Sequence, residues 1–298
     1  MTPKTFILGT RGSQLALRQS EMVRDALLRH FPTLQIELKI IKTKGDKLQH
    51  LSLDASGDKG LFTGALEEAL RAGEIDFAVH SLKDLPVDPA PGTRIAAYLP
   101  RAVTHDTLIG PMPLEALPEG ALIGTSSRRR AYQIAIHYPH LRTEPIRGNV
   151  ETRMGKVDAG LFDATLLAEA GLARLDMKDV TRYPISEEII VPAPGQAAIA
   201  VQTRDEDGEL QTLLQQIHDA KTEREVTIER SLLKRLGGGC ALPLGCVCHI
   251  EGETAELRVF YANASGTEHY LATHRTPLSD IDTLLSQLIE RLQHITTA

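Results

Sequence analysis

The stretch Ala72-Gly73-Glu74-Ile75-Asp76 follows a helical pattern and leads into an apolar strand, and Ala159-Gly160-Leu161-Phe162-Asp163 does the same further along the chain. Each stretch has a small residue and a glycine where a helix is expected to end, followed by an acidic residue before a strand. Self-similarity of this kind indicates an internal structural repeat.

The repeat extends upstream of both stretches in the same order. Lys59-Gly60 opens the helix that ends at Ala72, and Arg147-Gly148 opens the helix that ends at Ala159. Earlier still, Leu8-Gly9-Thr10 resembles Ile123-Gly124-Thr125, and each is followed by serine and a helical pattern. Three matches in one order predict two similar α/β lobes.

Strands and helices alternate within the first lobe. We expect strands at 6–8, 36–41 and 75–79, with a helix at 64–72 between the last two. Such alternation predicts a largely parallel sheet, with ligands at the carboxyl ends of its strands.

The remainder of the chain indicates a return to the first lobe and then a separate domain. A proline-rich crossover at 181–194 leads into the apolar run 195–201, and a helix at 222–236 precedes strands near 247–250, 255–261 and 269–273 and a helix at 278–292. The predicted fold class is α/β, with two lobes and a small C-terminal α+β domain. We expect residues 1–99 with about 195–218 to form a catalytic lobe, 100–194 a binding lobe, and 219–298 the C-terminal domain.

Composition excludes several classes of protein. The chain has 298 residues, a net charge of −6, a pI near 6.0, 4% aromatic residues and no tryptophan, which disfavours nucleic-acid binding. Three cysteines without a secretory signal predict a reducing, cytoplasmic location. Because the chain has no run of about 18 apolar residues, we expect no membrane span.

Two turns, 9–13 and 124–127, place backbone N–H groups at helix starts, which favour anions. Arg11, Arg129 and Arg130 lie beside these turns, and arginine is suited to bidentate carboxylate binding. The alternative is that the serines are ordinary N-caps and the arginines are solvated helix residues.

The first lobe has a concentration of ionisable groups that the second lobe does not match. His80-Ser81-Leu82-Lys83-Asp84 corresponds to Leu167-Ala168-Glu169-Ala170-Gly171 in the second lobe. Asp84 could stabilise a developing cation or accept an N–H bond, although an aspartate before Leu85-Pro86 could also cap a turn. His80 at a strand end is a weaker candidate and could be structural.

Cys240 ends the run Gly237-Gly238-Gly239-Cys240, where the glycines leave the thiol accessible for covalent chemistry. One alternative is a buried, inert cysteine. Another is a metal site made of Cys240, Cys246, Cys248 and His249, but the Cys-x-Cys-His spacing fits no zinc pattern with paired arms, and no metal is expected.

These motifs together resemble the hydroxymethylbilane synthase (porphobilinogen deaminase) family. In chain order the resemblance is carried by Gly9-Thr10-Arg11, Ser13, Leu15-Ala16-Leu17 and Gln19; Lys44-Gly45-Asp46; Lys59-Gly60-Leu61-Phe62; Ala78 to Pro86; Gly124-Thr125-Ser126-Ser127 with Arg129-Arg130; Arg147-Gly148-Asn149-Val150 with Thr152-Arg153; Ala170-Gly171-Leu172 with Arg174-Leu175; Pro194-Gly195-Gln196; and Gly238-Gly239-Cys240. Arg128 departs from the family pattern, and Cys246 and Cys248 have no assigned role.

The resemblance implies two lobes similar to type II periplasmic binding proteins and a third domain that carries the cofactor cysteine. It implies a dipyrromethane cofactor attached by a thioether to Cys240, onto which four porphobilinogen molecules are added stepwise with loss of ammonia. Hydrolysis then releases hydroxymethylbilane for tetrapyrrole biosynthesis. The family expectation is a monomer with no nucleic-acid or membrane partner.

The resemblance also assigns roles to residues. Asp84 is the expected catalytic residue and Cys240 the expected attachment site. The expected cofactor- and substrate-binding residues are Arg11, Ser13, Gln19, Lys59, Ser81, Lys83, Thr125, Ser126, Ser127, Arg129, Arg130, Arg147, Gly148, Asn149, Arg153, Arg174 and Gln196. The alternative function from another class is a two-lobe binding protein for a small carboxylate.

Overall fold

The computed structural model describes residues 5–43, 63–238 and 242–296. The chain divides into two compact units, residues 1–102 with 197–223, and residues 103–196 with 224–298. Each unit is described by itself.

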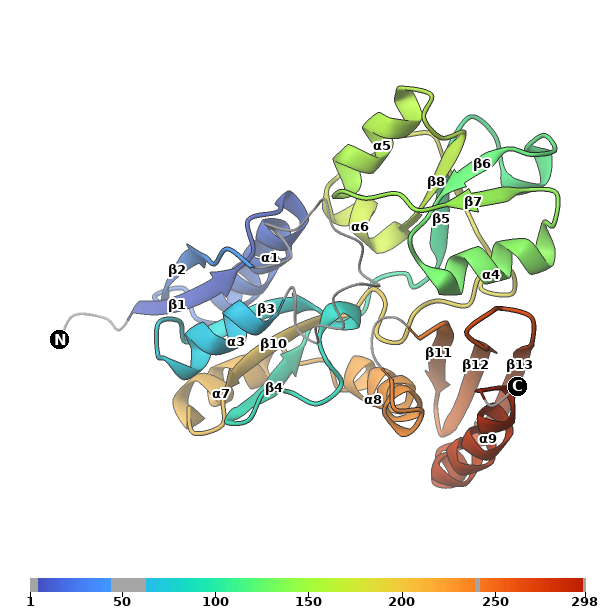
Figure 1. Ribbon diagram of the computed structural model, residues 1–298. Helices are drawn as coiled ribbons and strands as arrows, with labels where there is room; N and C mark the ends of the chain where they lie inside the picture. The colour runs from blue at the N-terminus through green and yellow to red at the C-terminus, as the bar shows by residue number, and fades with distance from the viewer. Residues whose placement is uncertain (1–4, 44–62, 239–241, 297–298) are drawn as a thin grey trace. The chain divides into compact units, whose positions relative to one another are not determined.

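The first unit is built on a five-stranded sheet in the order β2-β1-β3-β10-β4 (Figure 1). Strands β1 and β2 pair in parallel, as do β1 and β3, whereas β10 runs antiparallel to β3 and β4. The strands are β1 (Thr5–Thr10), β2 (Gln35–Ile40), β3 (Phe77–Ser81), β4 (Thr93–Tyr98) and β10 (Ile199–Arg204). The helices are α1 (Gln14–His30), α3 (Gly64–Arg71) and α7 (Gly208–Leu214), with 3₁₀ turns η2 (Leu82–Asp84) and η4 (Gln215–Ile217).

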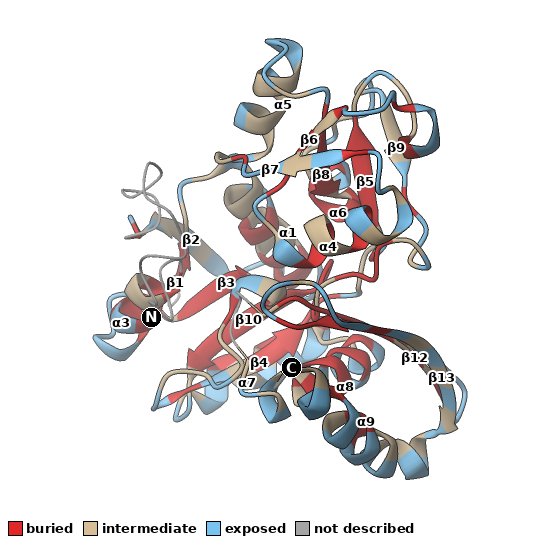
Figure 2. Cartoon of the chain, turned by 45° about the vertical axis from the view of Figure 1, so that its right-hand side comes forward, coloured by how far each residue is buried: buried red, intermediate tan, exposed pale blue. Residues whose placement is uncertain are grey.

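Side chains alternate between the two faces of this sheet. Phe6 and Phe77 pack with Val23 and Leu27 of α1 in one buried cluster, while Ala78 packs with α3 in another. Buried residues therefore line both faces of the sheet, and β3 and β10 are drawn largely in the colour of buried residues in Figure 2. This alternation decides which helix each polar residue at the strand ends can meet.

The second unit contains a sheet of the same design, in the order β7-β6-β8-β5-β9. Strand β6 is parallel to β7 and β8, and β5 is antiparallel to β8 and β9. The strands are β5 (Asp106–Ile109), β6 (Leu122–Gly124), β7 (Arg142–Glu144), β8 (Ala164–Ala168) and β9 (Arg182–Pro184). The helices are α4 (Arg128–His137), α5 (Val150–Asp158) and α6 (Glu169–Arg174), with the 3₁₀ turn η3 (Leu114–Ala116).

The predicted repeat is visible in matching hydrogen bonds. Asp76 Oδ2 accepts from Ile7 N at 2.8 Å and Asp76 N donates to Ile7 O at 2.8 Å. In the second sheet, Asp163 Oδ2 accepts from Leu122 N at 2.7 Å and Asp163 N donates to Leu122 O at 2.9 Å. The aspartate shared by the two sequence repeats therefore ties the start of its strand to the neighbouring strand in both lobes.

The expectation of largely parallel sheets was wrong in part. Both sheets are mixed, because β10 and β5 enter from outside their local βαβ units and run antiparallel to their neighbours. The return of the chain to the first lobe after residue 195 is confirmed, since β10 lies between β3 and β4.

The C-terminal part of the second unit has a three-stranded antiparallel sheet, β11-β12-β13. One face packs against α8 and α9 through Ile228, Leu232, Leu285 and Leu288. Its elements are β11 (Leu244–Glu251), β12 (Thr254–Ala262), β13 (His269–Pro277), α8 (Ala220–Arg235), η5 (Leu278–Asp280) and α9 (Ile281–Thr296).

The predicted fold class, α/β with two similar lobes and a small C-terminal α+β domain, is confirmed. Whether residues 219–298 form a separate domain stays a prediction, because residues 224–298 group with 103–196. Across the stretches that the structure describes, no helix is both long and apolar enough to cross a membrane.

Candidate functional site

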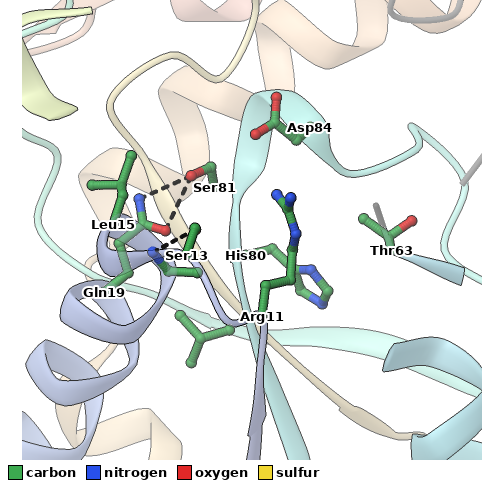
Figure 3. A pocket seen from close by; sticks show the side chains of 10 residues that line it. Arg11, Ser13, Leu15, Gln19, Thr63, His80, Ser81 and Asp84 are labelled. Atoms are coloured by element: carbon green, nitrogen blue, oxygen red, sulfur yellow. Dashed lines mark hydrogen bonds between the residues drawn. The ribbon is translucent and has the colours of Figure 1, made fainter. Parts of the chain in front are cut away.

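A cavity of about 70 Å³ lies where β1 and β3 of the first unit end (Figure 3). The loop after β1 contributes Arg11 and Ser13, and the end of β3 with the following turn contributes Ser81 and Asp84. The full lining is Arg11, Ser13, Leu15, Ala16, Gln19, Thr63, Val79, His80, Ser81 and Asp84. The cavity therefore lies at the carboxyl ends of parallel strands, where the sequence predicts that ligands bind.

Gln19 and Ser81 form a pair on the α1 side of the cavity. Gln19 Nε2 lies 2.8 Å from Ser81 Oγ, which lies 3.1 Å from Gln19 Oε1 (Figure 3). Gln19 is buried. Ser13 is the N-cap of α1, with its Oγ accepting from Ala16 N at 3.3 Å. The interpretation of Ser13 as an N-cap is thus correct, and the same residue also lines the cavity.

Asp84 is the last residue of η2 and its side chain is exposed at the cavity. Figure 3 shows its carboxylate on the same side of the cavity as the guanidinium of Arg11. Lys83 lies in the same turn, half-buried, and does not line the cavity. The cavity therefore combines a carboxylate and a guanidinium with uncharged hydrogen-bonding groups.

His80 is buried in the wall of the cavity. Because side chains alternate along β3, His80 and Ser81 lie on opposite faces of the sheet. Burial lowers the pKa of His80 to about 4, a side-chain hydrogen bond with Gln202 opposes that effect, and the charge of Arg11 adds to it. The imidazole is consequently neutral near pH 7.

The turn after β6 in the second unit has the same form as the turn after β1. Ser127 is the N-cap of α4, with its Oγ accepting from Arg130 N at 3.5 Å. Ser127 N donates to Thr125 Oγ1 at 3.2 Å, and Ser126 Oγ donates to Ile146 O at 2.8 Å. Thr125 is buried, Ser126 exposed and Ser127 half-buried.

Arg129 and Arg130 are buried around Asp106, which is fully buried itself. Arg129 Nη2 donates to Asp106 at 2.9 Å, and Arg130 donates through Nη2 at 2.7 Å and Nε at 3.2 Å. Gln196 Nε2 donates to the same carboxylate at 2.9 Å. Burial lowers the pKa of Arg129, and the charge of Asp106 opposes this. The alternative that these arginines are solvated helix residues was therefore wrong.

Two further guanidinium contacts complete this cluster. Arg129 Nη1 donates to Val191 O at 2.6 Å and Arg130 Nη1 to Leu166 O at 2.9 Å. Each guanidinium has five N–H donors, so these bonds leave further donors on both. The arginines are held rigidly, and their role toward a ligand stays a prediction.

A third set of predicted residues lies at the start of α5. Asn149 is the N-cap, with its Oδ1 accepting from Thr152 N at 2.9 Å. Arg153 Nε donates to Gly148 O at 2.9 Å, and Arg147 is half-buried. Gly148 has φ of 119°. Arg174 ends α6, and burial lowers its pKa to about 10.

Some predicted residues lie outside the described part of the chain. These are Lys59, the Lys44-Gly45-Asp46 motif and Cys240. Cys246 and Cys248 are described, and both are buried in the apolar core between β11 and the helices α8 and α9.

Sequence reasoning missed four buried polar residues. Asp106 anchors both arginines, Thr63 lines the cavity, and Glu67 and Gln202 are joined by a hydrogen bond within the first unit. Asp106 directly precedes Thr107-Leu108-Ile109, so an acidic residue at the start of a strand was a usable signal. No local pattern distinguishes Gln202 within the strand of residues 199–204.

The fold and the site together define a two-lobe α/β protein whose first lobe holds a guanidinium, a carboxylate and hydroxyl groups at the ends of its parallel strands. Residues 6–212 match the family described as "Porphobilinogen deaminase, dipyromethane cofactor binding domain", and residues 223–280 match "Porphobilinogen deaminase, C-terminal domain". The chain belongs to the porphobilinogen deaminase family.

Individual relatives agree with this assignment. The chain is 45% identical over 257 residues to a porphobilinogen deaminase of Roseiflexus sp. strain RS-1, covering 86% of this chain and 85% of the relative. It is 41% identical over 291 residues to one of Desulforudis audaxviator, covering 97% and 94%. A porphobilinogen deaminase of Nitrobacter winogradskyi is 42% identical over 277 residues, covering 92% and 88%.

Proposed function

We propose that this protein is a hydroxymethylbilane synthase, a transferase that joins four porphobilinogen molecules in turn to a dipyrromethane primer and releases ammonia and hydroxymethylbilane. The observation that carries the proposal is the meeting of Arg11, Ser81 and Asp84 in one cavity of a chain that matches the family along most of its length. We further propose a cytoplasmic monomer.

The side chains of the cavity suit a carboxylate-bearing pyrrole. Porphobilinogen carries an acetate and a propionate, which a guanidinium can bind with charge-assisted hydrogen bonds worth roughly 1.5–3 kcal/mol each. Arg11 offers such a group next to Ser13 and Ser81. When bound to Cys240, the dipyrromethane group would supply the free pyrrole carbon that the first new unit joins.

Asp84 is proposed to act on the charge that develops as ammonia leaves porphobilinogen. The loss leaves a cationic carbon conjugated to the pyrrole ring, and a carboxylate fixed beside it stabilises such a cation. The same carboxylate can accept a pyrrole N–H bond. The side chain of Asp84 is exposed at the cavity, so its carboxylate oxygens are accessible to a ligand.

The second lobe is proposed to bind carboxylates of the growing chain. Thr125, Ser127, Arg129, Arg130, Arg147 and Arg153 lie at the starts of α4 and α5, where backbone N–H groups favour anions. The pairing of Asp106 with two guanidiniums leaves that cluster with an excess positive charge, which favours an acidic ligand.

Incubation of the purified protein with porphobilinogen tests the function. We expect four ammonia molecules for every bilane formed, with bilane detected through its spontaneous cyclisation to a porphyrinogen. Tight binding of porphobilinogen without release of ammonia would instead support the two-lobe carboxylate-binding alternative.

A further inference from the structure

A short loop, residues 191–196, leads the chain from the second lobe towards β10, and we call it the crossover loop. It contains a turn in which Gln196 N donates to Ala193 O at 2.9 Å, with Pro194 and Gly195 at the two central positions. Gly195 has φ of 73°, and proline followed by such a glycine is typical of a type II turn. The hydrogen bond of the turn does not use the N–H of Gly195, so this buried donor requires an acceptor elsewhere.

Glu229, in the middle of α8, supplies that acceptor. Its Oε2 accepts from Gly195 N at 2.7 Å, and its Oε1 accepts from Cys248 N of β11 at 2.8 Å. The side chain of Glu229 is fully buried, and hydrogen bonds to a carboxylate are roughly twice as strong as neutral ones. One carboxylate therefore ties together α8, β11 and the crossover loop.

The crossover loop also lies directly against β11. Cys246 N donates to Pro192 O at 2.8 Å. A Cβ on Gly245 would lie 2.7 Å from Val191 O, so only a glycine allows the two backbones to approach this closely. Cys240 lies between α8 and β11 in the chain. The loop is thus joined to both of the elements that flank the predicted attachment site in sequence.

The other side of the crossover loop contacts the arginine cluster of the second lobe. Gln196 is fully buried, and its Nε2 donates to Asp106 Oδ1 at 2.9 Å and to Thr104 O at 2.7 Å. Asp106 is the carboxylate that aligns the two buried guanidiniums. Val191 O accepts from Arg129 Nη1 at 2.6 Å. The residue after Gly195 in the turn therefore reaches the centre of the cluster.

We propose that Glu229 is a positioning residue for the arginine pair, Arg129 and Arg130. It holds the turn of the crossover loop, the turn holds Gln196, and Gln196 holds Asp106, on which both guanidiniums are aligned. This path keeps the arginines in register with α8 and β11. The consequence for substrate binding rests on the proposed function, whereas the path of hydrogen bonds does not.

Two matched variants in α8 test the path. Glu229→Gln keeps the size of the side chain and replaces one acceptor oxygen by an amide NH₂, so either Gly195 N or Cys248 N loses its partner. Glu225→Gln is the control. Glu225 lies one helical turn earlier, is also buried, and accepts from Ile250 N of β11 at 3.1 Å. Both variants therefore remove a buried carboxylate that accepts from the backbone of β11.

Hydrogen exchange of guanidinium N–H groups, followed by ¹⁵N NMR of the holoenzyme, reports on the arginines without turnover. The Nε–H of Arg130 donates to Asp106 at 3.2 Å. Its exchange, relative to that of the Arg153 Nε–H in the same lobe, should be about two- to tenfold faster in Glu229→Gln, as for the loss of one hydrogen bond. It should stay within about twofold of wild type in Glu225→Gln. Equal exchange rates in the two variants would overturn the positioning role.

A double-mutant cycle tests whether Glu229 acts through Gln196. Gln196→Met removes the amide that donates to Asp106 and keeps the length of the side chain. In the wild-type background, Glu229→Gln should raise KM for porphobilinogen about two- to tenfold and leave kcat within about twofold. In the Gln196→Met background, it should raise KM less than about twofold, because the path is already broken. An equal increase in both backgrounds, or no increase in either, would contradict the proposal.

A second variant covers the case in which Glu229→Gln does not fold. Glu229→Asp keeps the charge but shortens the side chain by one methylene, so it cannot reach both backbone donors. The same exchange and kinetic results are expected of it. A wild-type protein that forms no bilane would contradict the proposed function, and the exchange measurement would still decide whether Glu229 positions the arginines.

Discussion

Arg130 holds Asp106 with two parallel hydrogen bonds, from Nη2 to Oδ1 at 2.7 Å and from Nε to Oδ2 at 3.2 Å. Asp106 is fully buried and also accepts from Arg129 at 2.9 Å. A buried carboxylate between two guanidiniums makes this cluster a structural anchor of the second lobe.

Replacement of Asp106 by Asn should therefore strongly destabilise the second unit. It leaves two buried guanidiniums without a counter-charge, and breaking a buried pair costs about 3–5 kcal/mol. Urea unfolding measures this change in free energy. Asp158→Asn, at the exposed end of α5, is the matched control and should change stability by less than about 0.5 kcal/mol. Equal stability of the two variants would remove the anchoring role.

Asp84→Asn should keep the fold and lose turnover. The side chain is exposed, so the free energy of unfolding should stay within about 0.5 kcal/mol of wild type. The loss of a charge facing a developing cation should lower kcat by about 10²–10³-fold. Steady-state kinetics measure kcat, and near-normal turnover would exclude Asp84 from the mechanism.

The buried His80 predicts a pH dependence of stability. Burial lowers its pKa in the folded protein to about 4, from an ordinary value of 6.5. Between these values the unfolded chain binds the additional proton, so stability rises with pH from about 4 to 6.5 and falls as pH is lowered through that window. Urea titrations at several pH values measure the free energy of unfolding. In His80→Gln this free energy should lack the part of its pH dependence that corresponds to the uptake of close to one proton on unfolding. The same slope in both proteins would mean that His80 titrates normally.

Gly148 is predicted to be irreplaceable at the start of α5. Its φ is 119°, and a Cβ there would lie 2.5 Å from Thr152 Cβ. Gly148→Ala should therefore destabilise the protein by about 1–3 kcal/mol and weaken substrate binding, because it displaces the turn that carries Arg147 and Asn149.

Gly155 provides the control in the same helix. It lies inside α5 with nothing within 4 Å of a built Cβ, so Gly155→Ala should stabilise the protein by about 0.5–1 kcal/mol. Thermal unfolding distinguishes the two variants, and a tolerated Gly148→Ala would show that the turn adapts.

The sequence predicted more of the fold than of the hydrogen bonds and ion pairs inside the site. The repeat around Asp76 and Asp163 predicted both lobes, because a strand start, a helix end and a turn are local features. The antiparallel course of β10 was not predicted, since the direction of a strand depends on where a long crossover brings it.

The site followed the same division between local and long-range features. Arg11, Ser13, Ser81 and Asp84 were expected together, and they line one cavity because strand ends of a parallel sheet meet at one edge. The Arg130–Asp106 pair and the Gln202–Glu67 contact join segments far apart in sequence, so no local spacing could indicate them.

The intact mass of freshly purified protein, with Cys240→Ser measured in parallel, shows whether the chain carries a dipyrromethane on Cys240. We expect the wild-type chain to be heavier than its sequence by two pyrrole units, and Cys240→Ser to have the unmodified mass and to form no bilane. A wild-type chain of unmodified mass that still forms bilane, or bilane formation by Cys240→Ser, would contradict this expectation.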